Sequence, residues 1–166
     1  MTELRTLSAQ AIPDAIERAK HYRLLNEPDQ AESICHDILA VDGDHQEVLV
    51  ILLLSLTDQF ATGGASAVSQ AKSVCARFTD EYQKTYYSGL INERDAKAML
   101  GKRGQQFRFV AYDRIQAALE HYGKAIEIHP PNNDDAILRW NACLRMIERN
   151  QLTAPDQSER DAMELE

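Results

Sequence analysis

One spacing of residues occurs three times along the chain. A small residue is followed four positions later by a bulkier apolar residue, and three positions after that by another small or apolar residue. The three occurrences are Ala31–Cys35–Ile38, Ala71–Cys75–Phe78 and Ala118–Tyr122–Ala125. Steps of four and three residues place side chains on one face of an α-helix. Similar helix faces that recur within a few tens of residues indicate an array of packed helical hairpins.

Two stretches around these spacings carry a family resemblance. The segment Ala118–Pro130 has a small residue, an aromatic residue, a second small residue and then proline, at positions 118, 122, 125 and 130. Residues 12–43 show the matching pair of helices, with Ala19 and Tyr22 on the first helix and Gly43 at the closing position. In these features the chain resembles the tetratricopeptide repeat family, whose unit is a helix–turn–helix of about 34 residues. The Tyr-Tyr-Ser-Gly-Leu segment from residue 86 is similar to a bacterial branch of that family, and this likeness implies no particular activity.

The resemblance predicts an all-α fold, a right-handed α-solenoid of about three tetratricopeptide-like units closed by a capping helix. The expected organisation is a polar lead-in at 1–11, units at 12–44, 45–80 and 81–131, a capping helix at 132–150, and an acidic, flexible tail at 151–166 with a weak helix near 157–165.

Two parts of this array are expected to depart from a regular repeat. We expect a flexible turn at Ala61–Ala65, because Gly63 and Gly64 favour turns. The third unit has longer helical patterns than the family unit, so we expect its two helices to form an extended antiparallel hairpin.

Composition narrows the classes of function. The formal net charge of −8 argues against a general nucleic-acid binder and against attraction to an anionic membrane. The apolar run at 48–54 is far shorter than the roughly 20 residues of a membrane helix. The three cysteines form no CxxC pair, so we expect buried free thiols in a reducing compartment. The chain lacks the common phosphate-loop, zinc-protease and serine-hydrolase motifs, so we expect no enzyme, no cofactor and no metal site.

The resemblance implies a cytoplasmic adaptor or scaffold that binds a protein or peptide on the concave face of the array. The positions that fall on this face in the family pattern are Lys20, Arg23, Leu56, Gln59, Tyr86 and Arg94, with Ile16, Leu24 and Leu90 beside them. Some family members hold a terminal carboxylate with Lys and Asn residues. Here Ile16 and Lys20 replace two of those residues, so this clamp is not predicted.

A basic stretch within this acidic chain suggests an alternative function, the binding of an anion or of RNA. Between residues 94 and 114 it contains Lys97, Lys102, Arg103, Arg108 and Arg114, interleaved with Phe107, Phe109 and Tyr112. Bases mixed with aromatics can bind single-stranded nucleic acid or another anion. The competing interpretation is that the aromatics pack the hairpin while the bases stay in water. A homodimer through an apolar face of this hairpin is also left open.

Overall fold

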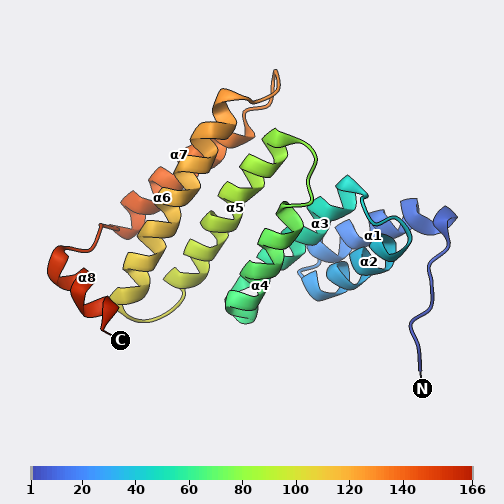
Figure 1. The fold of residues 1–166 in the computed structure, drawn as a ribbon, viewed down its shortest axis with the longest axis horizontal. Coiled ribbons are helices and arrows are strands. Elements are labelled where there is room, and N and C mark those ends of the chain that lie inside the picture. The colour runs from blue at the N-terminus through green and yellow to red at the C-terminus, as the bar shows by residue number, and fades with distance from the viewer. Residues whose placement is uncertain (1, 166) are drawn as a thin grey trace. The chain divides into compact units, whose positions relative to one another are not determined.

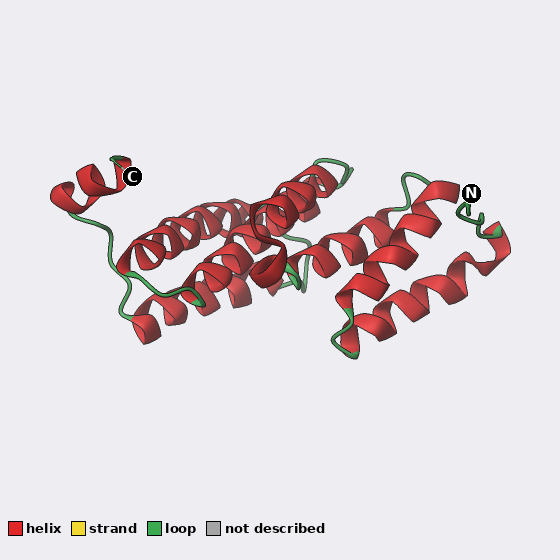
Figure 2. Cartoon of the chain, turned by 90° about the horizontal axis from the view of Figure 1, so that it is seen from below, coloured by secondary structure: helices red, strands yellow, loops and turns green. Residues whose placement is uncertain are grey.

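The computed structural model describes residues 2–165, and every regular element in that range is a helix (Figures 1 and 2). The all-α prediction is therefore confirmed. The chain divides into two compact units, residues 1–79 and 80–166. No helix in the described range is both long and apolar enough to cross a membrane.

The first unit begins with a short 3₁₀ turn at Ala9–Ala11 and continues with four α-helices. These are α1 (Ile12–Leu24), α2 (Pro28–Val41), α3 (Gln46–Thr57) and α4 (Phe60–Cys75). Helix α2 packs against α1, α3 packs against α2, and α4 packs against α3. Helix α3 also touches α1 over a smaller area, so the first and third helices share one face of this unit.

Local sequence explains where these helices begin. Pro13 and Pro28 lie in the first turns of α1 and α2, where a missing N–H costs no hydrogen bond. Asn26 adopts a left-handed conformation (φ 59°) between the two helices. At the start of α3, the His45 Nδ1 atom accepts a hydrogen bond from the Val48 backbone N–H at 3.4 Å.

The core of the first unit is built on α3, which is apolar on nearly all sides and packs against α1, α2 and α4. The residues of the first two recurring spacings lie around it, each less than 5% exposed. The third spacing, in the second unit, is fully buried as well. The pattern found in the sequence thus marks inward positions of α2, α4 and α6, except that Phe78 lies three residues beyond the end of α4.

The turn expected at Ala61–Ala65 is present only as a break at a single residue of that range, Gly64, and is therefore shorter than expected. The connection after α3 lies at Asp58 and Gln59, and α4 already begins at Phe60. The helix is interrupted only at Gly64, whose φ of 57° and ψ of −146° are accessible almost only to glycine. One glycine is sufficient to redirect the chain, so the neighbouring residues remain helical.

The second unit contains α5 (Glu81–Leu100), α6 (Gln105–Glu127), α7 (Asp135–Asn150) and α8 (Gln157–Glu164). Helices α5 and α6, of 20 and 23 residues, form the expected extended hairpin, which Figure 1 shows with α7 beside it. Helix α7 packs mainly on α6 and also touches α5. The second unit therefore repeats the arrangement of α1, α2 and α3, in which the third helix rests on the second and reaches the first.

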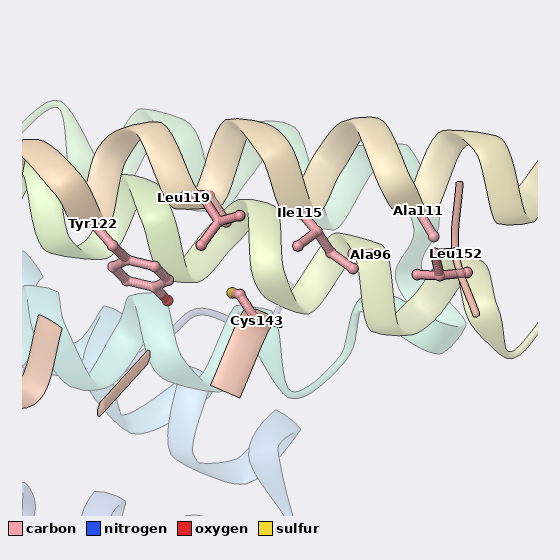
Figure 3. Close-up of a cluster of buried hydrophobic side chains, with 8 residues drawn as sticks. Ala96, Ala111, Ile115, Leu119, Tyr122, Cys143 and Leu152 are labelled. Atoms are coloured by element: carbon pink, nitrogen blue, oxygen red, sulfur yellow. The ribbon is translucent and has the colours of Figure 1, made fainter. Parts of the chain in front are cut away.

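The core of the second unit lies between α5, α6 and α7. Figure 3 shows the inward side chains of α6 together with those of Ala96 from α5 and Cys143 from α7. Gly89 of α5 lies against the Tyr122 ring, and a Cβ atom at that glycine would approach the ring to 2.7 Å. The close packing of α5 on α6 therefore depends on a glycine at this position.

The packed part of the second unit extends past the boundary expected at residue 150. Gln151 has a left-handed backbone (φ 50°), and the Leu152 N–H donates to the Ile147 carbonyl at 3.0 Å. This turn places the Leu152 side chain in the core, where it is 5% exposed. The helix expected near 157–165 is present as α8, and its first turn carries a reciprocal capping box between Asp156 and Glu159.

Candidate functional site

The two cations expected on the concave face of the first unit are both neutralised within the chain. The Lys20 ammonium lies 2.6 Å from a Glu47 carboxylate oxygen and 3.0 Å from one of Glu17. The hydrogen bond to Glu47 raises the pKa of Lys20 most, and the hydrogen bond to Glu17 raises it further. The Arg23 Nε–H donates to an Asp58 carboxylate oxygen at 2.8 Å. Both side chains thus link α1 to acids at the two ends of α3, and their charges are matched.

The two positions expected on α3 and in the turn after it do not offer an open binding surface. Leu56 is 3% exposed and belongs to the core, because α3 is covered by neighbouring helices on most sides. Gln59 is partly buried, and its amide donates to a Glu32 carboxylate oxygen at 2.7 Å. Placing Leu56 on a partner-binding face is therefore wrong. The same correction applies to Ile16 and Leu90, which are 6% and 4% exposed.

The two positions expected on α5 are partly covered. Tyr86 packs against the rings of Tyr82, Tyr87 and Tyr122, with ring centres between 5.0 and 5.8 Å apart. Burial raises the pKa of Tyr86 to about 12, and Asp135 adds to the shift. Arg94 is half-buried on the same helix.

The basic stretch from 94 to 114 does not gather on one surface. Lys97 binds Glu93 at 3.0 Å, whereas Arg114 binds Asp95 at 2.8 Å. Glu93 and Asp95 are two positions apart on α5, so they point about 200° apart around the helix. Two of the five bases therefore face different sides of the hairpin.

The other three bases of this stretch differ in their surroundings. Arg108 donates to the Asn150 carbonyl, and the Lys102 ammonium lies 5.2 Å from the centre of the Phe107 ring. Arg103 is exposed in the loop between α5 and α6. Phe109 is only 5% exposed and cannot stack on a base. The aromatics of this stretch contribute mainly to packing of the hairpin.

The structure places a different basic surface between α5 and α7. A hollow of about 380 Å³ is lined there by Lys97 and Leu100 of α5 and by residues of α7. We call it the α5–α7 pocket, and its α7 side chains are Arg139, Ala142, Arg145, Met146, Arg149 and Asn150. Four cations line this pocket and no acid does, although the chain as a whole carries a net charge of −8.

A buried carboxylate beneath the pocket fixes two of these cations. Glu93 is fully buried, and one of its carboxylate oxygens accepts from Lys97 at 3.0 Å and from Arg139 at 3.2 Å. Its other oxygen accepts from the Tyr122 hydroxyl at 2.7 Å. Burial raises the pKa of Tyr122, and the adjacent Glu93 raises it further, so the hydroxyl keeps its proton and remains a donor.

The remaining two cations of the pocket are not matched. Arg145 and Arg149 are exposed, and neither forms an ion pair with any carboxylate of the described part of the chain. They lie one helical turn apart on α7, so both guanidinium groups project to the same side. The charges of Lys20 and Arg23 are thus neutralised on the face that α1 and α3 share in the first unit. The face that α5 and α7 share in the second unit keeps two unpaired positive charges.

Sequence reasoning included Lys97 but did not identify the other members of this pocket. The available signal was the arginine pair Arg145 and Arg149 at a four-residue spacing on a helix that also carries Arg139. That spacing predicts a shared helix face. It does not show that α5 supplies the opposite wall, because the walls are about 40 residues apart in sequence.

Other candidate chemistry is sparse in the described range. Within residues 2–165, no group of three or more His, Cys, Asp or Glu side chains could hold a metal ion. Helix α7 begins at Asp135, whose N–H donates to the Asn133 side-chain oxygen at 3.0 Å, so these polar residues serve the start of the helix. Comparison of the chain with models of known protein families, with curated proteins and with solved structures found no match.

Proposed function

We propose that the chain is a tetratricopeptide-like α-solenoid that acts as a non-enzymatic adaptor and binds a segment of another protein. The support lies in the packing within each unit. In the first unit α3 rests on α2 and reaches α1, and in the second α7 rests on α6 and reaches α5. Arrays built in this way use the face shared by first and third helices to bind partners. The resemblance also places such an adaptor in the cytoplasm.

The α5–α7 pocket is the observation that carries this proposal. Its volume of about 380 Å³ is within the range of roughly 300–1,000 Å³ that is typical of ligand-binding hollows. The corresponding face in the first unit has its cations paired with Glu47 at the start of α3 and Asp58 just after its end. We therefore assign partner binding to the second unit, and not to Lys20 and Arg23.

The alternative of an RNA-binding hairpin has less support. Single-stranded nucleic acid needs a continuous basic surface with exposed aromatic rings. Lys97 and Arg114 face different sides of the hairpin, and Phe109 is buried. We therefore do not propose nucleic acid as the ligand.

Selection of peptides from a displayed random library on the immobilised protein tests the adaptor function. We expect peptides to be enriched on the wild type and to lose binding to Ala142→Trp, because the indole would fill the hollow between α5 and α7. Leu144→Trp is the matched control. Leu144 is exposed and lies two positions further along α7, about 200° around the helix from Ala142.

Both variants should keep the wild-type circular dichroism spectrum, and Leu144→Trp should bind the selected peptides normally. A selection that enriches no peptide would overturn the adaptor function. Peptides that bind Ala142→Trp as well as the wild type would place the binding surface elsewhere.

A further inference from the structure

We infer that the α5–α7 pocket takes an acidic segment of a partner protein, and that side-chain carboxylates of this segment bind Arg145 and Arg149. This inference rests on the proposed adaptor function and adds the chemistry of the ligand. It differs from the terminal-carboxylate clamp, because the recognised groups are side chains within the segment.

The distribution of charge is the first argument. Glu93 accepts hydrogen bonds from Lys97 and Arg139, which leaves one positive charge in excess from those three groups. Arg145 and Arg149 add two further charges that no carboxylate in residues 2–165 compensates. Like charges one turn apart on a helix repel each other. An incoming carboxylate would relieve this repulsion, whereas a neutral segment would leave it in place.

The type of cation is the second argument. A guanidinium group presents parallel N–H donors that match the two oxygens of a carboxylate. Arg145 and Arg149 are exposed on the pocket wall and have their donors available. Asn150 also lines the pocket, and its side chain is held because it donates to the Met146 carbonyl at 2.9 Å. The two arginines are therefore the adaptable binding groups of the pocket.

The apolar part of the lining favours a peptide over other anions. Leu100 of α5 and Ala142 and Met146 of α7 line the hollow between the charged groups. Methionine adapts to differently shaped apolar groups. No aromatic ring lines the pocket, so a nucleic-acid base would find no stacking partner there. A segment that alternates acidic and apolar side chains would match both parts of the lining.

The chain's own tail is the rival occupant. Residues 156–166 contain five acids and one arginine, and Leu165 is 88% exposed. In the structure this tail forms α8, whose Met163 and Ala162 instead lie with Gln105, Gln106 and Phe109 at the start of α6. The described part of the tail therefore lies beside the start of α6 and contributes no residue to the lining of the α5–α7 pocket.

Fluorescence anisotropy with a defined probe tests the inference. The probe is a fluorescein-labelled peptide, Glu-Leu-Glu-Glu-Leu-Glu, amidated at its C-terminus so that only side-chain carboxylates are offered. We expect Arg145→Ala/Arg149→Ala to weaken binding about tenfold or more. Arg18→Ala/Arg103→Ala removes the same charge at two exposed positions outside the pocket and should bind within about twofold of the wild type.

Two further probe peptides separate the contribution of the acidic side chains from that of the apolar side chains. A peptide with Gln in place of every Glu should not bind, and one with Ser in place of Leu should bind several-fold more weakly. Raising NaCl from about 50 mM to about 300 mM should weaken binding of the acidic probe, because exposed charges are screened.

Equal binding of the acidic and Gln peptides, or equal loss in both double variants, would overturn the inference. It would also be overturned if an amidated peptide of residues 156–166 displaced the probe more effectively than unlabelled probe, because the occupant would then be the chain's own tail. If library peptides are blocked by Ala142→Trp but ignore Arg145 and Arg149, the adaptor function stands and the acidic ligand is excluded.

Discussion

Glu93 is the residue on which the second unit's polar architecture depends. Its carboxylate is fully buried and accepts hydrogen bonds from Lys97 on its own helix, Tyr122 on α6 and Arg139 on α7. A buried carboxylate is tolerated only when its oxygens are satisfied in this way. The same contacts hold Lys97 and Arg139 at the wall of the α5–α7 pocket. One buried acid thus contributes both to the packing of three helices and to the shape of the candidate site.

Removing the Tyr122 hydroxyl tests this network. Tyr122→Phe keeps the ring but leaves one Glu93 oxygen without a donor, so we expect a loss of about 1–3 kcal/mol in the free energy of unfolding. Tyr112→Phe on the same helix is the control, because the Tyr112 hydroxyl has no hydrogen-bond partner among residues 2–165. Urea unfolding followed by circular dichroism measures both. Equal losses in the two variants would show that the bond to Glu93 contributes nothing.

At the scale of elements, the sequence predicted those features of the helices that depend on local periodicity alone. The recurring spacings marked buried positions correctly on α2, α4 and α6, because a helix face depends only on steps of three and four residues; Phe78 is buried although it follows the end of α4. Leu56 was misplaced, since its exposure depends on how many helices pack around α3, which no local pattern contains. The α5–α7 pocket was missed for the same reason. The burial of Glu93 could have been predicted, because Glu93 lies seven residues after Tyr86 and so falls on the apolar side of α5.

The approach of α5 to α6 depends on Gly89. We expect Gly89→Ala to lower the free energy of unfolding by about 1–3 kcal/mol, because the new Cβ would lie 2.7 Å from a buried Tyr122 ring that cannot move aside. Gly101→Ala is the matched control at the end of the same helix. Its Cβ would be 3.4 Å from the nearest atom, and its φ of −73° suits any residue. Thermal unfolding compares the two, and a Gly89→Ala variant as stable as Gly101→Ala would contradict the close contact.

At the scale of the molecule, charge is unevenly distributed. Residues 1–79 carry six Lys and Arg against eleven Asp and Glu, and residues 80–155 carry eleven against ten. The acidic character of the chain therefore comes mainly from the first unit and from the tail after residue 155. The unmatched arginines of the α5–α7 pocket lie in the one large segment whose charge is close to balanced. A net charge of −8 thus does not exclude a local surface that attracts acids.

Buried thiols in both units make the stability of the protein depend on pH at alkaline values. Burial raises the pKa of Cys35 in the first unit to about 12, with a further effect of Glu32. Burial raises the pKa of Cys143 in the second unit to about 12 as well, with a further effect of Glu93. The folded state therefore favours the protonated thiols. This stabilisation is complete below the ordinary thiol pKa of 9.0, and it is lost as the pH rises from 9 towards 12, because the unfolded chain releases its protons first.

We expect the urea midpoint to fall as the pH is raised from about 9 to about 11, with each thiol lowering the free energy of unfolding by roughly 1 kcal/mol per pH unit. Cys143→Ala removes one titrating group, so its midpoint should fall less steeply than that of the wild type even though the variant starts from lower stability. Ser73→Ala, at an exposed position, controls for substitution without loss of a thiol and should keep the wild-type slope. Identical slopes for Cys143→Ala and the wild type would show that the Cys143 thiol has no raised pKa in the folded protein.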